Sequence, residues 1–258
     1  MPVDYLLEDH VARVTLNRPE RRNAIDAGMH AELGSIWAEV EANPDVRVVV
    51  LTGAGDHAFC AGDDLKSHDG KTGTDYWLDL RPDGFGHLTL RQTLSVPVLA
   101  RVNGFALGGG LELVIGCDLA VAADTAEFGF VEPRVGRLPL DGGVVALTRQ
   151  LPAKWAMEVL LTGRRFSAEE AARMALVNEV VPPAQLDAAV ERWLDLLLAC
   201  APLSLRAIKA ITKTTEGMTA RSARLQQVPE LLACLASEDG REGVQAFREK
   251  RAPRWTGT

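Results

Sequence analysis

The sequence predicts an α/β protein with a buried parallel sheet, and two patterns support this fold class. Apolar runs typical of strands alternate with helical patterns along the first 195 residues, as in folds whose helices pack on a sheet. Residues 46–52 are apolar almost throughout except for Arg47, which is typical of a strand covered on both faces. With 258 residues, of which 47% are hydrophobic, the chain is long enough to bury a substantial core.

Charge and cysteine content narrow the classes of function. The 28 basic and 35 acidic residues give a net charge of −7, which disfavours nucleic acid as the main partner. The four cysteines lack the paired spacing of a structural zinc site, so we expect no metal and free, mostly buried thiols in a reducing compartment. The first residues lack the pattern of a secretory signal, and no run of about 18 apolar residues offers a membrane span. We therefore expect a cytoplasmic protein without a membrane partner.

Hydrophobic periodicity places the elements around this sheet. We expect a strand at residues 11–16, a loop at 17–23, and an amphipathic helix from Met29 to Val40 that ends near Pro44. The further predictions are a mobile loop region at 66–84, a short helix at 85–94, strands at 98–102 and 119–123, a helix after the glycines at 108–110, and a loop at 124–139.

Helical patterns dominate after about residue 140. Ser167 and Glu170 have the spacing of a capping box that begins a helix. Periodic apolar residues then predict helices at 185–199, 203–214 and 220–236. We therefore divide the chain into an α/β core, residues 1–195, which holds the candidate site, and a helical region, residues 196–258, whose apolar faces cover its own core or a neighbouring subunit.

Residues 103–113, NGFALGGGLEL, join two apolar segments through three successive glycines. Such a run permits a sharp bend or a close approach of the backbone to another group. A helix that begins inside the run would present N–H groups without a partner beside the carboxylate of Glu112. One interpretation is a backbone-donor site with an acid or base next to it. A glycine-rich turn with a glutamate on the surface explains the same residues equally well.

A second glycine loop follows the strand at 46–52. Residues 53–58, GAGDHA, fit the dinucleotide-binding pattern G-x-G-x-x-A, but the loop continues to Asp64 and does not open directly into an amphipathic helix. This disfavours a nicotinamide or flavin site. Two N–H groups, one from each glycine loop, are able to converge on a single oxygen, as in an oxyanion hole. No Gly-x-Ser-x-Gly sequence supports a serine nucleophile.

Glu112 and Glu132 are the carboxylates nearest to these loops in the sequence. Glu132 lies among apolar residues before Pro133, and burial there would raise its pKa toward the neutral range that general acid–base catalysis requires. From spacing alone, a solvated loop glutamate is the simpler interpretation.

Taken together, these motifs resemble those of the enoyl-CoA hydratase/isomerase (crotonase) superfamily. The resemblance covers nearly the whole chain, in the family's order and spacing. It is carried by residues 16–24 (LNRPERRNA), 59–65 (FCAGDDL), 103–110 (NGFALGGG), Glu132, the glycines at 142–143 and residues 241–251 (REGVQAFREKR). It implies a core of ββα turns wound as a spiral and a helical carboxyl-terminal region that builds homotrimers or dimers of trimers. It also implies an acyl-CoA thioester as substrate, with coenzyme A part of the substrate and no separate cofactor.

The resemblance also implies roles for individual residues. The backbone N–H groups of Asp63 and Gly109 hold the thioester oxygen, and Glu112 and Glu132 fall where hydratases keep two catalytic glutamates. That pair holds a water against the double bond, deprotonates it and protonates the α-carbon through an enolate-like state. Isomerases of the family often keep only the later carboxylate, so the presence of both favours hydration.

Contacts with coenzyme A follow from the same resemblance. They are expected from Ala24, Ala61, Asp64, Leu65, Lys66 and Gly108, and from Phe247 and Lys250 of a neighbouring subunit. For these side chains, a surface charge or a packed aromatic is an equally simple interpretation.

Two residues complicate the assignment as an ordinary hydratase. Asp63 occupies a position often held by a small or apolar residue, so its side chain either turns away from the oxyanion or binds a polar or cationic group of the acyl chain. Asp141 is either a third carboxylate of the pocket or the cap of the next helix, and we favour the cap. The wall of the acyl pocket is expected in residues 66–95.

The sequence therefore predicts a 2-enoyl-CoA hydratase. The alternatives are an isomerase or a dehydratase acting on an unusual polar acyl-CoA, or a non-catalytic oligomer with the same fold.

Overall fold

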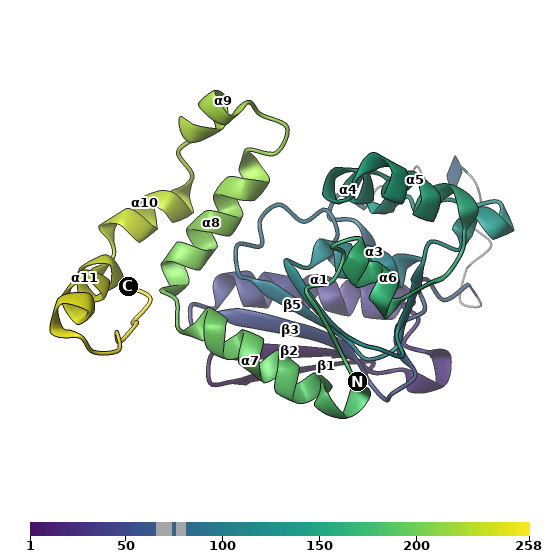
Figure 1. Ribbon diagram of the computed structural model, residues 1–258, viewed down its shortest axis with the longest axis horizontal. Coiled ribbons are helices and arrows are strands. Elements are labelled where there is room, and N and C mark those ends of the chain that lie inside the picture. Colours follow the sequence, from purple (N-terminus) through teal and green to yellow (C-terminus); the bar gives the residue numbers. More distant parts are fainter. Residues whose placement is uncertain (66–73, 76–80) are drawn as a thin grey trace.

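The computed structural model describes residues 1–65, 74–75 and 81–258, which form two sheets covered by helices (Figure 1). The first sheet has the strand order β1-β2-β3-β5-β7-β10 and the second β4-β6-β8-β9, which confirms the α/β class. The strands are β1 (Val3–Glu8), β2 (Val11–Leu16), β3 (Val48–Gly53), β4 (Ala58–Cys60), β5 (Val98–Val102), β6 (Phe105–Leu107), β7 (Leu119–Ala123), β8 (Glu127–Gly129), β9 (Phe166–Ser167) and β10 (Glu179–Val181).

Helices fill the connections and form the whole carboxyl-terminal region. The α-helices are α1 (Ala27–Ala42), α3 (Gly109–Gly116), α4 (Gly143–Gln150), α5 (Ala153–Thr162), α6 (Ala168–Arg173), α7 (Leu186–Leu198), α8 (Pro202–Thr214), α9 (Ala220–Arg224), α10 (Pro229–Ala236) and α11 (Glu238–Glu249). The 3-10 helices are η1 (Pro19–Arg21), η2 (Phe85–His87), η3 (Glu132–Val135) and η4 (Pro183–Gln185). Among the residues that the structure describes, no helix has the length and apolar character needed to cross a membrane.

The chain winds through the two sheets in repeated turns. The pairs β3 and β4, β5 and β6, and β7 and β8 each give their first strand to the first sheet and their second to the other. Consecutive turns pair in parallel in both sheets. This is the expected spiral, and it places the loops that follow β4 and β6 beside each other.

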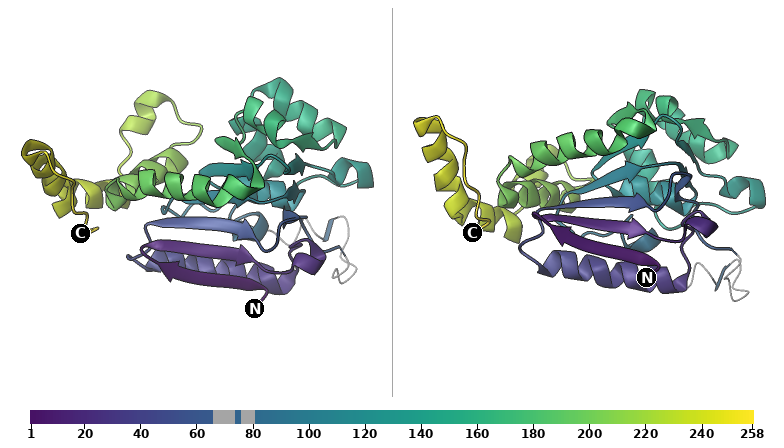
Figure 2. Two further views of the ribbon diagram at one scale, coloured as in Figure 1. Left: turned by 60° about the horizontal axis from the view of Figure 1, so that its bottom comes forward. Right: turned by 90° about the horizontal axis from the view of Figure 1, so that it is seen from below.

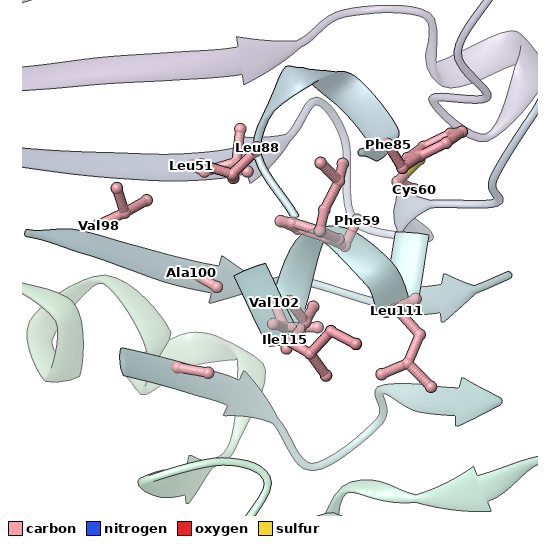
Figure 3. Close-up of a cluster of buried hydrophobic side chains, with 14 of the residues drawn as sticks. Leu51, Phe59, Cys60, Phe85, Leu88, Val98, Ala100, Val102, Leu111 and Ile115 are labelled. Atoms are coloured by element: carbon pink, nitrogen blue, oxygen red, sulfur yellow. The ribbon is translucent and has the colours of Figure 1, made fainter. Parts of the chain in front are cut away.

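Strand β3 is buried on both faces, as the apolar run at residues 46–52 predicts. α1 packs on one face, where Trp37 and Leu51 belong to the same buried cluster, and α7 packs on the other, where Leu194 belongs to the cluster around Val48 and Val50. Figure 2 shows these two helices on opposite sides of the sheet. Figure 3 shows how the first face continues toward the second sheet through Phe59. Full burial of such side chains contributes about 1.5–3 kcal/mol each.

Several local expectations for the core are wrong. β1 is a strand that the sequence did not predict, and it pairs antiparallel with β2, so the sheet is mixed. Residues 85–94 form only the short turn η2, because Gly84 and Gly86 have φ values of +73° and +59° that interrupt a helix. The expected loop at 124–139 contains β8 and η3.

The glycines at 53 and 55 lead into β4 and not into a helix, in agreement with the rejected dinucleotide site.

Helices α9, α10 and α11 extend away from both sheets (Figure 1). The single helix expected at 220–236 is wrong: Val228 is extended, with φ −103° and ψ 148°, as the residue before Pro229 prefers to be. α11 was not predicted, although Ser237 caps it by accepting the Gly240 N–H. The division into domains at residue 195 stays a prediction. The loop region expected at 66–84 lies mostly outside the described residues.

The thiols differ in exposure. All four cysteines are free, as expected, but only Cys60 is buried, and Cys200 is exposed. The expectation that most of them are buried is therefore wrong.

Candidate active site

The two glycine loops touch, as the spiral requires. Gly62 follows β4 with φ +92°, and a Cβ atom added to it would lie 3.1 Å from the backbone N of Gly109 and 2.9 Å from the carbonyl oxygen of Leu107. A side chain at position 62 would therefore intrude between the loops. The absence of that side chain brings the backbone of residues 62–63 against the start of α3.

Two hydrogen bonds fix the direction of the Asp63 backbone. Ile25 N–H donates to the Gly62 carbonyl at 2.8 Å, and Asp64 N–H donates to the Ile25 carbonyl at 2.9 Å. These two bonds make Ile25 and Asp63 a parallel bridge pair. In parallel pairing, the residue between two such bonds directs its own N–H and C=O to the opposite side. The Asp63 N–H group therefore points away from residue 25.

Gly109 is the second residue whose backbone N–H group is expected to hold the thioester oxygen. It is the first residue of α3, where amide groups have no acceptor within the helix. A Cβ atom at this position would lie 2.4 Å from Cζ of Phe85, a ring that is only 1% exposed. Phe85 thus packs directly against Gly109 and fixes its place. Figure 3 shows Phe85 next to Cys60, the residue just before the first loop.

Glu112 is buried within α3. The residue is 3% exposed, and its Oε1 accepts the N–H of Gly143, the first residue of α4, at 2.7 Å. Burial raises the pKa of Glu112 to about 8, against the lowering effect of the Gly143 bond, and the charges of Asp141 and Glu132 raise it further. The alternative of a surface glutamate at the helix start is wrong.

Glu132 begins η3, directly after β8 and the buried Phe130. Its Oε1 would lie 3.0 Å from a Cβ added to Gly108, so the carboxylate rests against the glycine run. Its Oε2 is buried without a hydrogen-bond partner among the described residues. Burial raises the pKa of Glu132 to about 7. The structure therefore replaces the solvated loop glutamate with a desolvated one beside Glu112.

Asp141 is not the cap of α4. The cap position belongs to Gly142, with φ +124°, and no side chain accepts a hydrogen bond there. Asp141 Oδ2 instead accepts from Arg81 Nη1 at 3.1 Å, and both side chains are largely buried. Because the Asp141 charge raises the pKa of Glu112, the ion pair lies at the edge of the carboxylate site. The expectation of a cap is wrong, and the alternative of a third pocket carboxylate stays a prediction.

Four of the eight expected coenzyme A contacts line one cavity. It has a volume of about 360 Å³ and is lined by Glu20, Arg21, Arg22, Ala24, Ala61, Asp63, Asp64 and Leu65. The N–H groups of Ala24 and Ala61 are used within the loops, by the carbonyls of Arg21 and Arg22. The cavity thus lies between the loop at residues 61–65 and the loop before α1.

Gly108 does not line this cavity and lies against Glu132 instead. Two further expected contacts lie elsewhere. Phe247 belongs to α11 and Lys250 directly follows it, far from the sheets (Figure 1), and Phe247 is 85% exposed. One chain alone therefore does not bring them to the cavity. Lys66 lies outside the described residues.

Sequence reasoning missed four residues that shape the site. Gly62 and Gly143 stand in glycine motifs that were noted, but nothing local marks which glycine approaches which loop. Phe85 and Arg81 follow a stretch without a clear pattern, and only tertiary contacts reveal them.

Two desolvated carboxylates lie beside two touching glycine loops on a two-sheet α/β spiral, an arrangement suited to acid–base chemistry. Comparisons with known proteins identify the family. Residues 7–258 match the family model described as enoyl-CoA hydratase/isomerase. The chain belongs to the enoyl-CoA hydratase/isomerase family.

Named relatives and solved structures agree. (E)-Benzylidenesuccinyl-CoA hydratase of Thauera aromatica is 39% identical over 260 residues, which cover 100% of both chains. Carnitinyl-CoA dehydratase of Shigella flexneri is 41% identical over 254 residues, which cover 96% of this chain and 95% of the relative. The structure of an enoyl-CoA hydratase from Bacillus anthracis matches with a TM-score of 0.91, at 31% identity and 100% coverage of both chains. One from Mycobacterium tuberculosis matches with a TM-score of 0.88, at 33% identity and 99% coverage of each.

Replacing Glu112 with glutamine is expected to stabilise the protein in alkali. The folded pKa of about 8 lies above that of an unfolded glutamate, so this group favours folding below the unfolded pKa and loses that contribution as the pH rises through 8. Glutamine cannot ionise, and its oxygen still accepts the Gly143 N–H. We expect Glu112→Gln to raise the melting temperature by about 5 °C or more near pH ~9, and to change it little near pH ~5.

Differential scanning fluorimetry at both pH values measures this effect. Glu127→Gln, on the adjacent strand β8 and half exposed, is the matched control and should show no such difference. Equal shifts at both pH values would contradict the burial of an ionising Glu112.

Proposed function

We propose that this protein is an enoyl-CoA hydro-lyase, which adds water across the 2,3 double bond of an enoyl-CoA thioester or removes it in the reverse direction. One observation carries the proposal: Glu112 and Glu132 are both desolvated, and burial brings both pKa values close to neutral, to about 8 and about 7. A pair of this kind holds one proton between its members near neutral pH, which provides a base and an acid in one site.

The proton balance of hydration matches such a pair. The ionised glutamate takes a proton from water while the water oxygen bonds to C3 of the acyl chain. The electron pair of the double bond moves toward the thioester oxygen and forms an enolate. The protonated glutamate then delivers its proton to C2, and the enolate returns to the thioester. No net oxidation or reduction occurs, so the reaction requires no redox cofactor.

The enolate oxygen needs stabilisation, and we assign this to the N–H groups of Asp63 and Gly109. The contact between Gly62 and the Gly109 nitrogen, the outward direction of the Asp63 N–H and the position of Gly109 at the head of α3 support this assignment. Donors of this kind stabilise charge that develops in the transition state, and each one contributes roughly 3–4 kcal/mol.

We propose that the acyl chain is polar. The named relatives act on benzylidenesuccinyl-CoA and carnitinyl-CoA, whose acyl groups carry charge. In this chain the Arg81–Asp141 ion pair lies next to Glu112. Charged groups at this edge suit a polar or cationic acyl chain better than a plain hydrocarbon.

We also propose a cytoplasmic homotrimer or dimer of trimers. The exposed apolar side chains of the carboxyl-terminal helices, among them Leu232, Leu235, Val244 and Phe247, favour burial against another copy. Phe247 and Lys250 would then approach coenzyme A bound to a neighbour. Light scattering of the purified protein distinguishes trimer from hexamer, and a monomer would contradict the proposal.

The direct test is the loss of enoyl-thioester absorbance when the protein meets a panel of enoyl-CoA compounds. The panel includes crotonyl-CoA and thioesters with anionic and cationic acyl chains. Hydration of any member, with the product identified by mass spectrometry, supports the hydro-lyase. Migration of the double bond without addition of water would favour an isomerase, and no turnover on the panel would favour a non-catalytic oligomer. Asp63→Ala should change the acyl preference, and an unchanged preference would remove that side chain from recognition.

A further inference from the structure

Arg18 bonds to both of the backbone segments that pair at the bridge between Ile25 and Asp63. Its Nη1 donates to the Ala24 carbonyl at 3.0 Å and lies 2.9 Å from Asp26 Oδ2. Its Nη2 donates to Asp64 Oδ2 at 3.0 Å. The Arg18 side chain is 18% exposed and that of Asp64 is 9% exposed, so water competes little for these bonds.

The guanidinium spans the one short ladder that orients Asp63. On one side of the ladder stand Ala24 and Ile25, and on the other stand Gly62 and Asp64. Asp26, which Arg18 also holds, caps α1 by accepting the Met29 N–H at 2.9 Å. The planar fork of an arginine can bond several acceptors at once in a fixed geometry. Arg18 thus ties the loop at residues 62–64 to the well-anchored start of α1.

We propose that Arg18 is a positioning residue for the oxyanion site, which it serves by fixing the direction of the Asp63 N–H group. This inference rests on the proposed function, because it assigns Arg18 to the same reaction. Arg18 does not line the cavity and is not a catalytic residue. It acts through Asp64 and Ala24, the neighbours of the bridge pair.

Arg18 has a second effect, through charge. Asp64 is the residue next to Asp63, and its carboxylate is nearly buried, so a negative charge stands close to the oxygen that becomes an enolate. An opposite charge at 3.0 Å reduces the repulsion between that carboxylate and the enolate. Loss of Arg18 therefore both loosens the donor and leaves this charge less compensated.

The test compares Arg18→Gln and Arg18→Lys with Arg13→Gln. Arg13 lies on β2, and its replacement removes an exposed ion pair with Glu191 of α7. Kinetics of the best substrate from the panel give kcat and KM separately. We expect Arg18→Gln to lower kcat by about 10- to 100-fold, part of the 10²–10³ that loss of one donor costs. KM should change much less. Arg18→Lys keeps the charge without the fork and should fall between, and Arg13→Gln should match the wild type.

A spectroscopic measurement separates positioning from a purely structural role. Dimethylaminocinnamoyl-CoA is a conjugated thioester that absorbs at longer wavelength when its carbonyl oxygen is polarised. The wild type should shift its absorbance to the red, and Arg18→Gln should lose most of that shift while still binding the thioester. If Arg18→Gln does not fold, Arg18→Lys and Asp64→Asn serve instead, and each should show a reduced shift.

The outcomes distinguish the inference from the function on which it rests. Folded Arg18 variants could keep both the wild-type red shift and the wild-type kcat per folded molecule. That result overturns the role of Arg18 but does not affect the proposed hydro-lyase activity. If the wild type binds the thioester without any red shift, the oxyanion site is wrong, and the inference is overturned with it.

Discussion

Replacing either buried glutamate with glutamine is expected to lower kcat by about 10²- to 10⁴-fold, the usual contribution of a positioned acid or base. Glutamine has the same shape as glutamate, so Glu112→Gln preserves the acceptor for the Gly143 N–H. It cannot accept a proton from water or deliver one to C2. The loss should therefore appear in kcat, with the fold retained and KM changed little. Steady-state kinetics on the panel substrate measure both parameters.

The pH dependence of the wild type gives the same prediction an independent check. Glu112 and Glu132 must share one proton. The rate should therefore fall below pH ~7, where both glutamates are protonated, and above pH ~8, where both glutamates are ionised. These limits follow from the pKa values of about 7 for Glu132 and about 8 for Glu112. Glu127→Gln is the matched control and should keep the full profile. Turnover within threefold of wild type in either variant would exclude that residue from the chemistry.

Replacing Gly109 with alanine is expected to reduce kcat by about 10²- to 10³-fold, as the loss of one oxyanion donor does. The added methyl group would lie 2.4 Å from Phe85 Cζ, and Phe85 is buried too tightly to move without displacing the start of α3. Either the Phe85 ring or the start of α3 must shift. A shift of α3 carries the Gly109 N–H group away from the thioester. The measurement is again kcat with the preferred enoyl-CoA, together with the red shift of the conjugated thioester.

Two further variants make this result specific. Gly240→Ala, in α11, places its methyl group no closer than 3.7 Å to Ser237 Oγ, and it should leave activity unchanged. The double variant Gly109→Ala with Phe85→Leu provides space for the methyl group and should recover part of the rate. Full activity of Gly109→Ala alone would show that its N–H does not hold the oxyanion.

Periodicity and motifs predicted much of the architecture, because they record which face of an element is buried. The apolar run before Thr52 indicated a strand covered on both faces, and α1 and α7 do cover it. The glycine run next to Glu112 indicated a helix start with a carboxylate, and α3 begins at Gly109. The family resemblance then supplied the spiral, which no local pattern encodes.

The parts that were wrong depend on contacts between distant segments. Glu132 resembled a solvated loop residue because its carboxylate rests against Gly108, which is 24 positions earlier in the chain. Asp141 resembled a helix cap because aspartate is common there, but the neighbouring Gly142 adopts the cap position and Arg81 takes the carboxylate. In both cases a partner far along the chain outweighs the local preference.

The direction of the Asp63 backbone has a consequence for how this enzyme can change. A donor that belongs to the main chain survives any substitution whose backbone keeps the Ile25 bridge. Position 63 can therefore acquire a charged, polar or apolar side chain while the N–H group that we propose as an enolate donor stays in place. Substrate preference and reaction chemistry are separable at one residue, which makes position 63 the place to begin a directed-evolution library for new acyl chains.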